Sequence, residues 1–116
     1  MQKKEVEKSP SNHIIIIMSM VVFLNRRFAK DPFIVFRKIA DEFILVPIKQ
    51  RAGDVESIYT INEVGGRIWE LIDGDKRIEE IRDVIIEEFE VGSKEAETDL
   101  TEFIEQLEQI GAVRAL

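Results

Sequence analysis

The chain has 116 residues with one histidine, no cysteine and a net charge of −7. Its length predicts one domain with a modest core. The lack of cysteine excludes disulfides, thiolate nucleophiles and cysteine-bound metals, and it permits the reducing cytoplasm in which we expect the protein. Seven basic and three acidic residues give +4 over 26–51, whereas sixteen acidic and six basic residues give −10 over 62–116. The C-terminal half therefore attracts basic partners and repels phosphate.

Residues 1–25 are predicted to form an N-terminal arm beside a domain over residues 26–116. The first twelve residues are polar and charged, which favours disorder. Residues 14–24 are nearly all apolar, but a membrane-spanning helix needs about 20 such residues, so we expect no membrane insertion. Their β-branched content favours a strand that pairs with its own or another chain's sheet, and a homodimer could form through it. Alternatively, translation of the protein begins at Met18 or Met20.

The segments after the arm favour an antiparallel sheet. Runs of β-branched and aromatic residues predict three strands, at residues 33–37, 42–48 and 55–61. The dipeptide Ala40-Asp41 forms the predicted turn between the first two strands, and a polar loop over residues 49–54 joins the last two. Because the strands are apolar at most positions, we expect helices on one face and a peptide or partner on the other.

Three helices follow the predicted strands. Asn62 is a typical N-cap for the first helix, which Asp73-Gly74 should end. The second helix is predicted over residues 78–89. The third is expected to begin with Ser93 as its N-cap and to end at Gly111. The helical half is thus predicted to begin directly after the third strand.

Apolar residues recur at helical spacing on each predicted helix. The longest stripe, on the third helix, consists of Ala96, Leu100, Phe103, Ile104, Leu107 and Ile110. The tail over residues 112–116 is open to assignment as a strand. The order of elements predicts an α+β fold: a winged-helix-like domain in which a three-stranded antiparallel sheet is followed by three helices.

The pair Gly65-Gly66 lies inside the first predicted helix. Each glycine there costs about 1 kcal/mol relative to alanine, so the pair needs a reason. We expect the backbone of another element to pass close to it. A phosphate site is the disfavoured alternative, because it would need the glycines in a loop ahead of the helix.

The sequence does not favour catalysis. Its acidic residues fall on the outer faces of the predicted helices, and Ser-His-Asp, Walker, Rossmann and EF-hand patterns are absent, so we expect no catalytic residue, metal or cofactor. Nor do we expect nucleic acid in a winged-helix mode, because Lys94 is the only base of the third helix beside six acids. Arg37, Lys38, Lys49 and Arg51 leave a nucleic-acid-binding regulator as the weakest alternative.

Three blocks of the sequence point to a known family. They are EFILVP at 42–47, YTINEVGGRIWELIDG at 59–74, and EEFEV at 87–91 followed by Glu95-Ala96-Glu97 and Phe103. With these blocks, residues 31–113 resemble the PqqD-like family, the pyrroloquinoline quinone (PQQ) biosynthesis protein D group. The chain departs from the family pattern at Arg77, where the family often has Thr, and in the arm before residue 25.

The resemblance implies a non-catalytic peptide chaperone. Such a recognition element binds the leader of a ribosomally made precursor peptide and presents it to a modifying enzyme, a radical S-adenosylmethionine enzyme in the founding pathway. The products are PQQ or related peptide-derived cofactors and natural products. The leader lies as an added strand beside the third strand and against the third helix. An open strand edge beside an apolar stripe favours the same β-augmentation.

The expected peptide site draws on the third strand and the third helix. Its residues are Ser57, Ile58, Tyr59, Thr60, Leu100, Phe103, Ile104 and Leu107. Core packing is the competing interpretation for the four helix residues. The nearby acids Glu102 and Glu105 favour a leader with Lys or Arg. The alternative function is a protein-interaction or oligomerisation module without peptide cargo, in which the arm over residues 14–24 pairs two chains.

Overall fold

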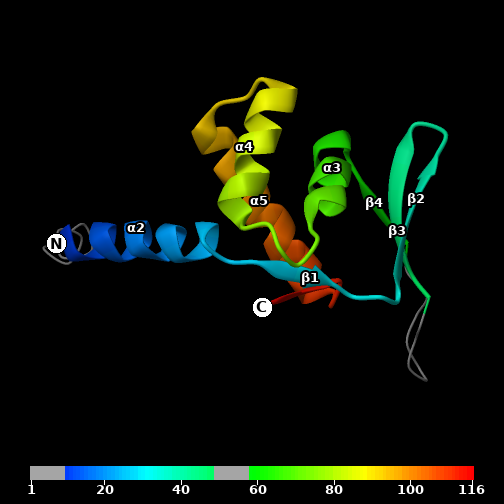
Figure 1. Ribbon diagram of the computed structural model, residues 1–116, viewed down its shortest axis with the longest axis horizontal. Helices are drawn as coiled ribbons and strands as arrows, with labels where there is room; N and C mark the ends of the chain where they lie inside the picture. Colours follow the sequence, from blue (N-terminus) through cyan, green and yellow to red (C-terminus); the bar gives the residue numbers. More distant parts are fainter. Residues whose placement is uncertain (1–9, 49–57) are drawn as a thin grey trace, which may run out of the picture.

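The computed structural model describes residues 10–48 and 58–116. In chain order these residues form α2 (Pro10–Leu24), β1 (Phe28–Lys30), β2 (Ile34–Ile39), β3 (Glu42–Pro47), β4 (Tyr59–Ile61), α3 (Glu63–Leu71), α4 (Ile78–Phe89), α5 (Ser93–Gln109) and β5 (Val113–Ala115) (Figure 1). The predicted α+β class is confirmed, with a three-stranded antiparallel sheet followed by three helices. The structure adds helix α2 and a small sheet made of β1 and β5.

The larger sheet has the strand order β2-β3-β4, with β3 in the centre. Ile39 pairs with Glu42, so Ala40 and Asp41 form the two-residue turn that the sequence predicted. Ala40 has a φ of 58°, as tight hairpins of this kind require. Strand β4 pairs with β3 through only three residues of each strand. The first part of the predicted third strand, residues 55–57, lies outside the described residues.

The smaller sheet joins the two ends of the domain. Strand β5 confirms the strand assignment for the tail, and it pairs antiparallel with β1. The sequence did not predict β1, because a three-residue strand whose partner lies at the other end of the chain has no local signature. Phe28 of β1 is buried, and the backbone N–H of Asp31 donates to the carbonyl of Ala112 at 2.8 Å. The small sheet thus places β1 against the helices.

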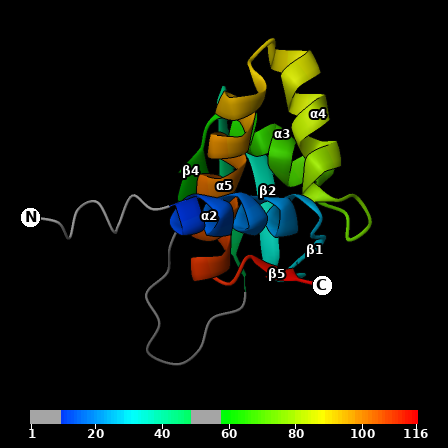
Figure 2. The same cartoon turned by 90° about the vertical axis from the view of Figure 1, so that its left-hand side faces the viewer.

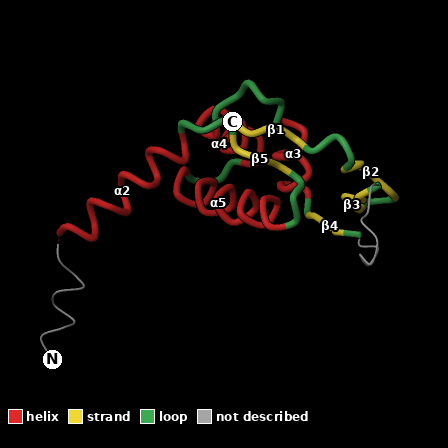
Figure 3. Tube along the Cα trace, turned by 90° about the horizontal axis from the view of Figure 1, so that it is seen from below, coloured by secondary structure: helices red, strands yellow, loops and turns green. Residues whose placement is uncertain are grey.

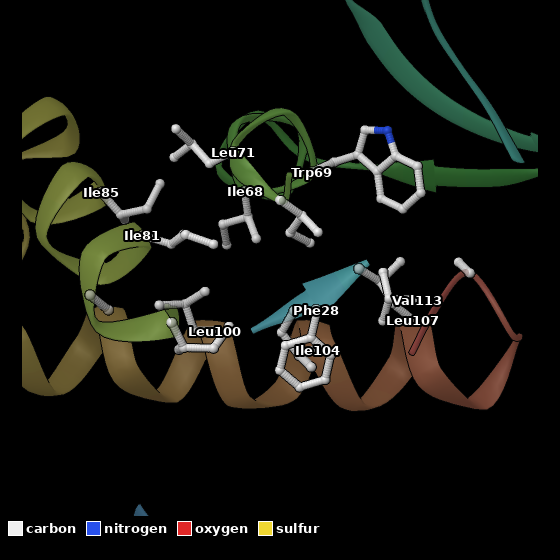
Figure 4. Packing of buried hydrophobic residues seen from close by; sticks show 14 of the residues in the cluster. Phe28, Ile68, Trp69, Leu71, Ile81, Ile85, Leu100, Ile104, Leu107 and Val113 are labelled. Carbon is white, nitrogen blue, oxygen red and sulfur yellow. The ribbon is translucent and has the colours of Figure 1, made fainter. Parts of the chain in front are cut away.

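The core lies between α3, α4 and α5, with β1 beside them (Figure 4). The side chains that point into it are apolar, and those labelled in Figure 4 are Phe28, Ile68, Trp69, Leu71, Ile81, Ile85, Leu100, Ile104, Leu107 and Val113. No polar or charged residue of the described ranges is buried. The inward stripes predicted for α4 and α5 therefore form the core, as their spacing required.

The helix boundaries follow local capping. The Asn62 side chain accepts a hydrogen bond from the backbone N–H of Gly65 at 2.8 Å, which confirms it as the N-cap of α3. Gly74, with a φ of 83°, takes the left-handed conformation in the turn after this helix. Helix α4 has its predicted bounds. The predicted N-cap of α5 is wrong: Gly92 is the N-cap and Ser93 already helical, since the Gly92 carbonyl accepts from the Ala96 N–H.

Two ion pairs, one exposed and one partly buried, connect the three C-terminal helices. Arg67 of α3 donates to both carboxylate oxygens of Glu88 on α4, at 2.8 and 2.9 Å. These hydrogen bonds hold the pKa of the Glu88 carboxyl below its ordinary value. Arg82 of α4 donates to a carboxylate oxygen of Glu97 on α5 at 2.8 Å. Such pairs add little stability at the surface, but they align the helices that form the site.

The strand prediction for residues 14–24 is wrong, because these residues belong to α2. The helix projects from the body of the molecule, and it has no sheet edge beside it (Figures 2 and 3). A helix satisfies its own backbone hydrogen bonds, whereas a strand needs a neighbour, so this isolated segment is helical. Among the α2 side chains that the structure describes, Phe23 and Leu24, at the end next to the body, pack against the core. The domain boundary after residue 25 remains a prediction.

Most of the α2 side chains that the structure describes are exposed despite their apolar character. The large apolar side chains described as exposed are Ile15, Ile17, Met18, Val21 and Val22. Within the described ranges, no helix combines the length and apolar character needed to cross a bilayer. The exposed side chains of α2 therefore form an apolar surface that residues 10–48 and 58–116 leave uncovered.

Candidate functional site

Strand β4 has one open edge. It pairs with β3 on one side, and no strand in residues 10–48 or 58–116 pairs with its other side. Tyr59 and Ile61 are half-buried against the core, while Thr60 between them is exposed. Ile58, just before the strand, is 62% exposed. The free edge therefore offers unpaired backbone donors and acceptors to another extended chain.

A groove begins where β4 ends, and it lies between the first turns of α3 and the middle of α5. It has a volume of about 170 Å³. The residues that line it are Asn62, Val64, Gly65, Ile68, Asp99, Glu102, Phe103 and Gln106. The first of these directly follows the last residue of β4. The groove thus lies next to one end of the open edge.

The two glycines of α3 admit two aromatic rings. A Cβ atom on Gly65 would lie 3.3 Å from the ring of Phe103, and one on Gly66 would lie 3.1 Å from the ring of Phe43. The prediction that the backbone of another element passes close to this pair is wrong, because the close neighbours are side chains from α5 and β3. Since Gly65 has no side chain, it forms part of the groove wall beside Phe103.

The eight predicted site residues fall into three groups. Ser57 lies outside the described residues, whereas Ile58, Tyr59 and Thr60 follow the open edge. Phe103 is half-buried and lines the groove. The other three helix residues face the core, with exposures of at most 2%: Leu100, Ile104 and Leu107. These three side chains lie on the core-facing side of α5, next to the side that carries Phe103. They therefore fix the helix in the core and do not line the groove.

The rim of the groove is acidic. Asp99 and Glu102 line it from α5, and neither forms an ion pair within the described parts of the chain. Glu105, the second acid expected to influence the site, is exposed and does not line the groove. No basic side chain is among the lining residues. The groove thus combines an apolar wall with uncompensated negative charge.

Sequence reasoning missed most of the lining residues. Those that it did not assign to the site are Asn62, Val64, Gly65, Ile68, Asp99 and Gln106. The usable signal was the glycine pair, whose helix-propensity cost indicates a close approach at that point of α3. The sequence did not reveal that the approaching group was Phe103, since α3 and α5 are far apart along the chain.

An open strand edge that leads into an apolar, acid-rimmed groove defines a small α+β binding domain of winged-helix-like build. Within that class, the chain belongs to the PqqD family: the model of coenzyme PQQ synthesis protein D matches residues 42–113. A solved structure, TbiB1 in complex with the TbiA(beta) leader peptide, matches with a TM-score of 0.60 and 29% identity, over 73% of this chain and 93% of that one. No curated protein matches the sequence.

Proposed function

We propose that this protein is a peptide chaperone that binds the leader of a ribosomally made precursor peptide and presents it to a modifying enzyme. The observation that carries the proposal is the open edge of β4 leading into the groove at Asn62. Membership of the PqqD family supports it, and so does the similarity to TbiB1, whose structure contains a leader peptide. The protein acts by binding, and a radical S-adenosylmethionine enzyme is the proposed partner.

Binding by strand addition divides the work between backbone and side chains. The backbone of β4 hydrogen-bonds to the leader whatever its sequence, and the groove selects among side chains. Of the predicted helix residues, Phe103 is the one placed to touch the leader, because Leu100, Ile104 and Leu107 are buried. The absence of cysteine permits this activity in a reducing cytoplasm, where we place it.

Calorimetric titration tests the proposal directly. Leader segments of small peptides encoded near this chain's gene are added to the full chain, and at least one should bind. Phe103→Asp should abolish binding, because it places a charge at the apolar wall of the groove. Circular dichroism checks that the variant keeps its helices.

Phe89→Asp is the matched control for this titration. Phe89 is also half-buried, and it ends α4 outside the groove lining. The control should bind leader as the unmodified chain does, even if both variants lose stability. Undiminished affinity in the Phe103 variant would place the site elsewhere, and failure of every neighbouring leader to bind would refute the proposed function.

The second candidate function is self-association through α2. The observation that favours it is the exposed apolar surface of this helix, which includes Ile17 at 53% and Val21 at 60% exposure. A second copy of α2 would cover that surface and form a homodimer. Light scattering of the full chain and of a chain that starts at Met20 tests this, since only the full chain should be dimeric. The same number of chains per particle in both samples would exclude it.

A further inference from the structure

We propose that the groove selects leaders in which a large apolar residue and a lysine or arginine stand two positions apart. This inference rests on the proposed function, and it assigns separate roles to the two kinds of lining residue. The apolar wall around Gly65 and Phe103 takes the apolar side chain. The carboxylates of Asp99 and Glu102 take the cation.

The size of the groove fits one large apolar side chain. Its volume is about 170 Å³, and a cavity of about 150 Å³ is enough to hold a benzene molecule. Val64 and Ile68 of α3 supply apolar surface on one side, and Phe103 of α5 supplies it on another. A ring or a branched aliphatic side chain would therefore fill the groove, and its burial favours binding.

The spacing of the second residue follows from the geometry of α5. The α5 lining residues Asp99, Glu102 and Gln106 fall at i, i+3 and i+7, which places them on one side of the helix along about 10 Å. An extended peptide advances about 3.3 Å per residue, and its alternate side chains point to the same side. The side chain two positions from the apolar anchor therefore also faces α5, about 6.6 Å along the peptide and within the length that the three lining residues span.

Charge complementarity decides what this second residue is. Asp99 and Glu102 have no ion-pair partner in the described ranges, and no base lines the groove. The segment from residue 62 to 116 also carries sixteen acids against six bases. A carboxylate on the peptide would be repelled there, whereas lysine or arginine gains two carboxylate partners.

Gly65 limits the depth of the groove. A Cβ atom at this position would lie 3.2 Å from Oδ1 of Asn62 and 3.3 Å from Cε1 of Phe103, so an alanine would require the Asn62 side chain and the half-buried ring to shift by a few tenths of an ångström. The same substitution favours the helix, since glycine is a poor helix former. Gly65→Ala should therefore reduce peptide affinity without lowering stability, which separates a binding role from a structural one.

A displayed library of random twelve-residue peptides, selected on the full chain, tests the preference without knowledge of the natural leader. Enriched peptides should share an apolar residue and a lysine or arginine two positions away. Enrichment of peptides without this pair would overturn the inference but leave the proposed function intact. No enrichment of any peptide would count against both.

Two variants then assign the roles, with affinities measured on an enriched peptide. Gly65→Ala should weaken binding about tenfold or more, the loss expected for one displaced apolar anchor. The double variant Asp99→Asn and Glu102→Gln should weaken it about fivefold and reduce its salt dependence, as expected for exposed charge pairs. The control is Glu105→Gln with Glu108→Gln, two exposed acids of α5 outside the groove. Equal losses in both double variants would refute a local cation site.

Discussion

Helices α2 and α5 are similar in length, 15 and 17 residues, but they differ in how their apolar residues are arranged. Helix α2 is almost entirely apolar from residue 14 onward, and it projects from the body (Figure 1). Helix α5 is rich in glutamate, and yet it supplies four residues of the core. The comparison shows that a one-sided pattern positions a helix in a core better than a high apolar content does.

The two helices also differ in what they leave for partners. Helix α5 buries one stripe inside the protein and presents Phe103 with two acids at its border. Helix α2 has apolar residues around its circumference, so no single contact with the body could cover them. Its exposed surface therefore invites association, whereas the exposed part of α5 is shaped for a specific peptide.

The largest expected effect is the difference in unfolding free energy between a variant in α5 and a matched variant in α2. Ile104→Ala in α5 should lower the free energy of unfolding by about 2–5 kcal/mol, because Ile104 is fully buried. The matched change Ile17→Ala in α2 should cost about 0.5 kcal/mol or less, since Ile17 is 53% exposed. Urea unfolding measures both. Similar costs would mean that α2 packs against something in solution, such as a second copy.

Two negative charges introduced on α2 test whether its apolar surface drives self-association. Ile17→Glu with Val21→Glu should weaken self-association by about tenfold or more, because it places two charges in the apolar surface. Unfolding free energy should change little, as these side chains lie outside the core. Sedimentation velocity measures the association. Ser19→Glu, a charge at an exposed polar position of α2, should have the smaller effect.

The two parts of the molecule should also differ in how their stability depends on pH. Residues 14–24 of α2 have no ionisable side chain, whereas the turn before α4 has several. Lys76 donates to the Asp73 carboxylate at 2.8 Å, and this bond with two backbone N–H donors holds the pKa of Asp73 well below its ordinary 3.8. The folded state thus binds this proton less tightly than the unfolded state. Its stabilisation is present above that ordinary value and is lost as the pH falls.

Asp73→Asn tests this pH dependence. The variant should lose about 1 kcal/mol or less at neutral pH, the range expected for an exposed ion pair. Its unfolding free energy should then decrease less steeply than that of the unmodified chain on acidification. Urea unfolding at several pH values measures the slopes. An unchanged slope would show that other carboxylates, such as Glu88, govern acid stability.

The smallest effect is expected at the β2–β3 hairpin, which lies outside both helices. Ala40 has a φ of 58°, a conformation that glycine adopts without steric cost. Ala40→Gly should therefore raise the unfolding free energy by about 0.5 kcal/mol, after the larger entropy of glycine in the unfolded chain is subtracted. Thermal unfolding measures the change. Ala29→Gly in β1, where the backbone needs no positive φ, should lower stability instead.

Local patterns in the sequence were enough for much of the helical half. The bounds of α4, the N-cap at Asn62 and the turn at Ala40 each depend on residues a few positions apart. Two parts of the candidate site were also predictable. The open third strand was expected because it is the last strand of the sheet, and Phe103 was expected because it belongs to the apolar stripe on α5. These features depend on hydrogen bonds between near neighbours in the sequence and on the helical repeat, and a local pattern shows both.

The sequence by itself therefore determined the α+β order of elements, the core stripes and the family resemblance. Only the tertiary structure decided that residues 14–24 are helical, that β1 pairs with β5, and that Phe103 packs against Gly65 to form one wall of the groove. Each of these depends on whether a partner far along the chain lies nearby in space. No local pattern encodes that proximity, because it arises only when the helices pack on one another.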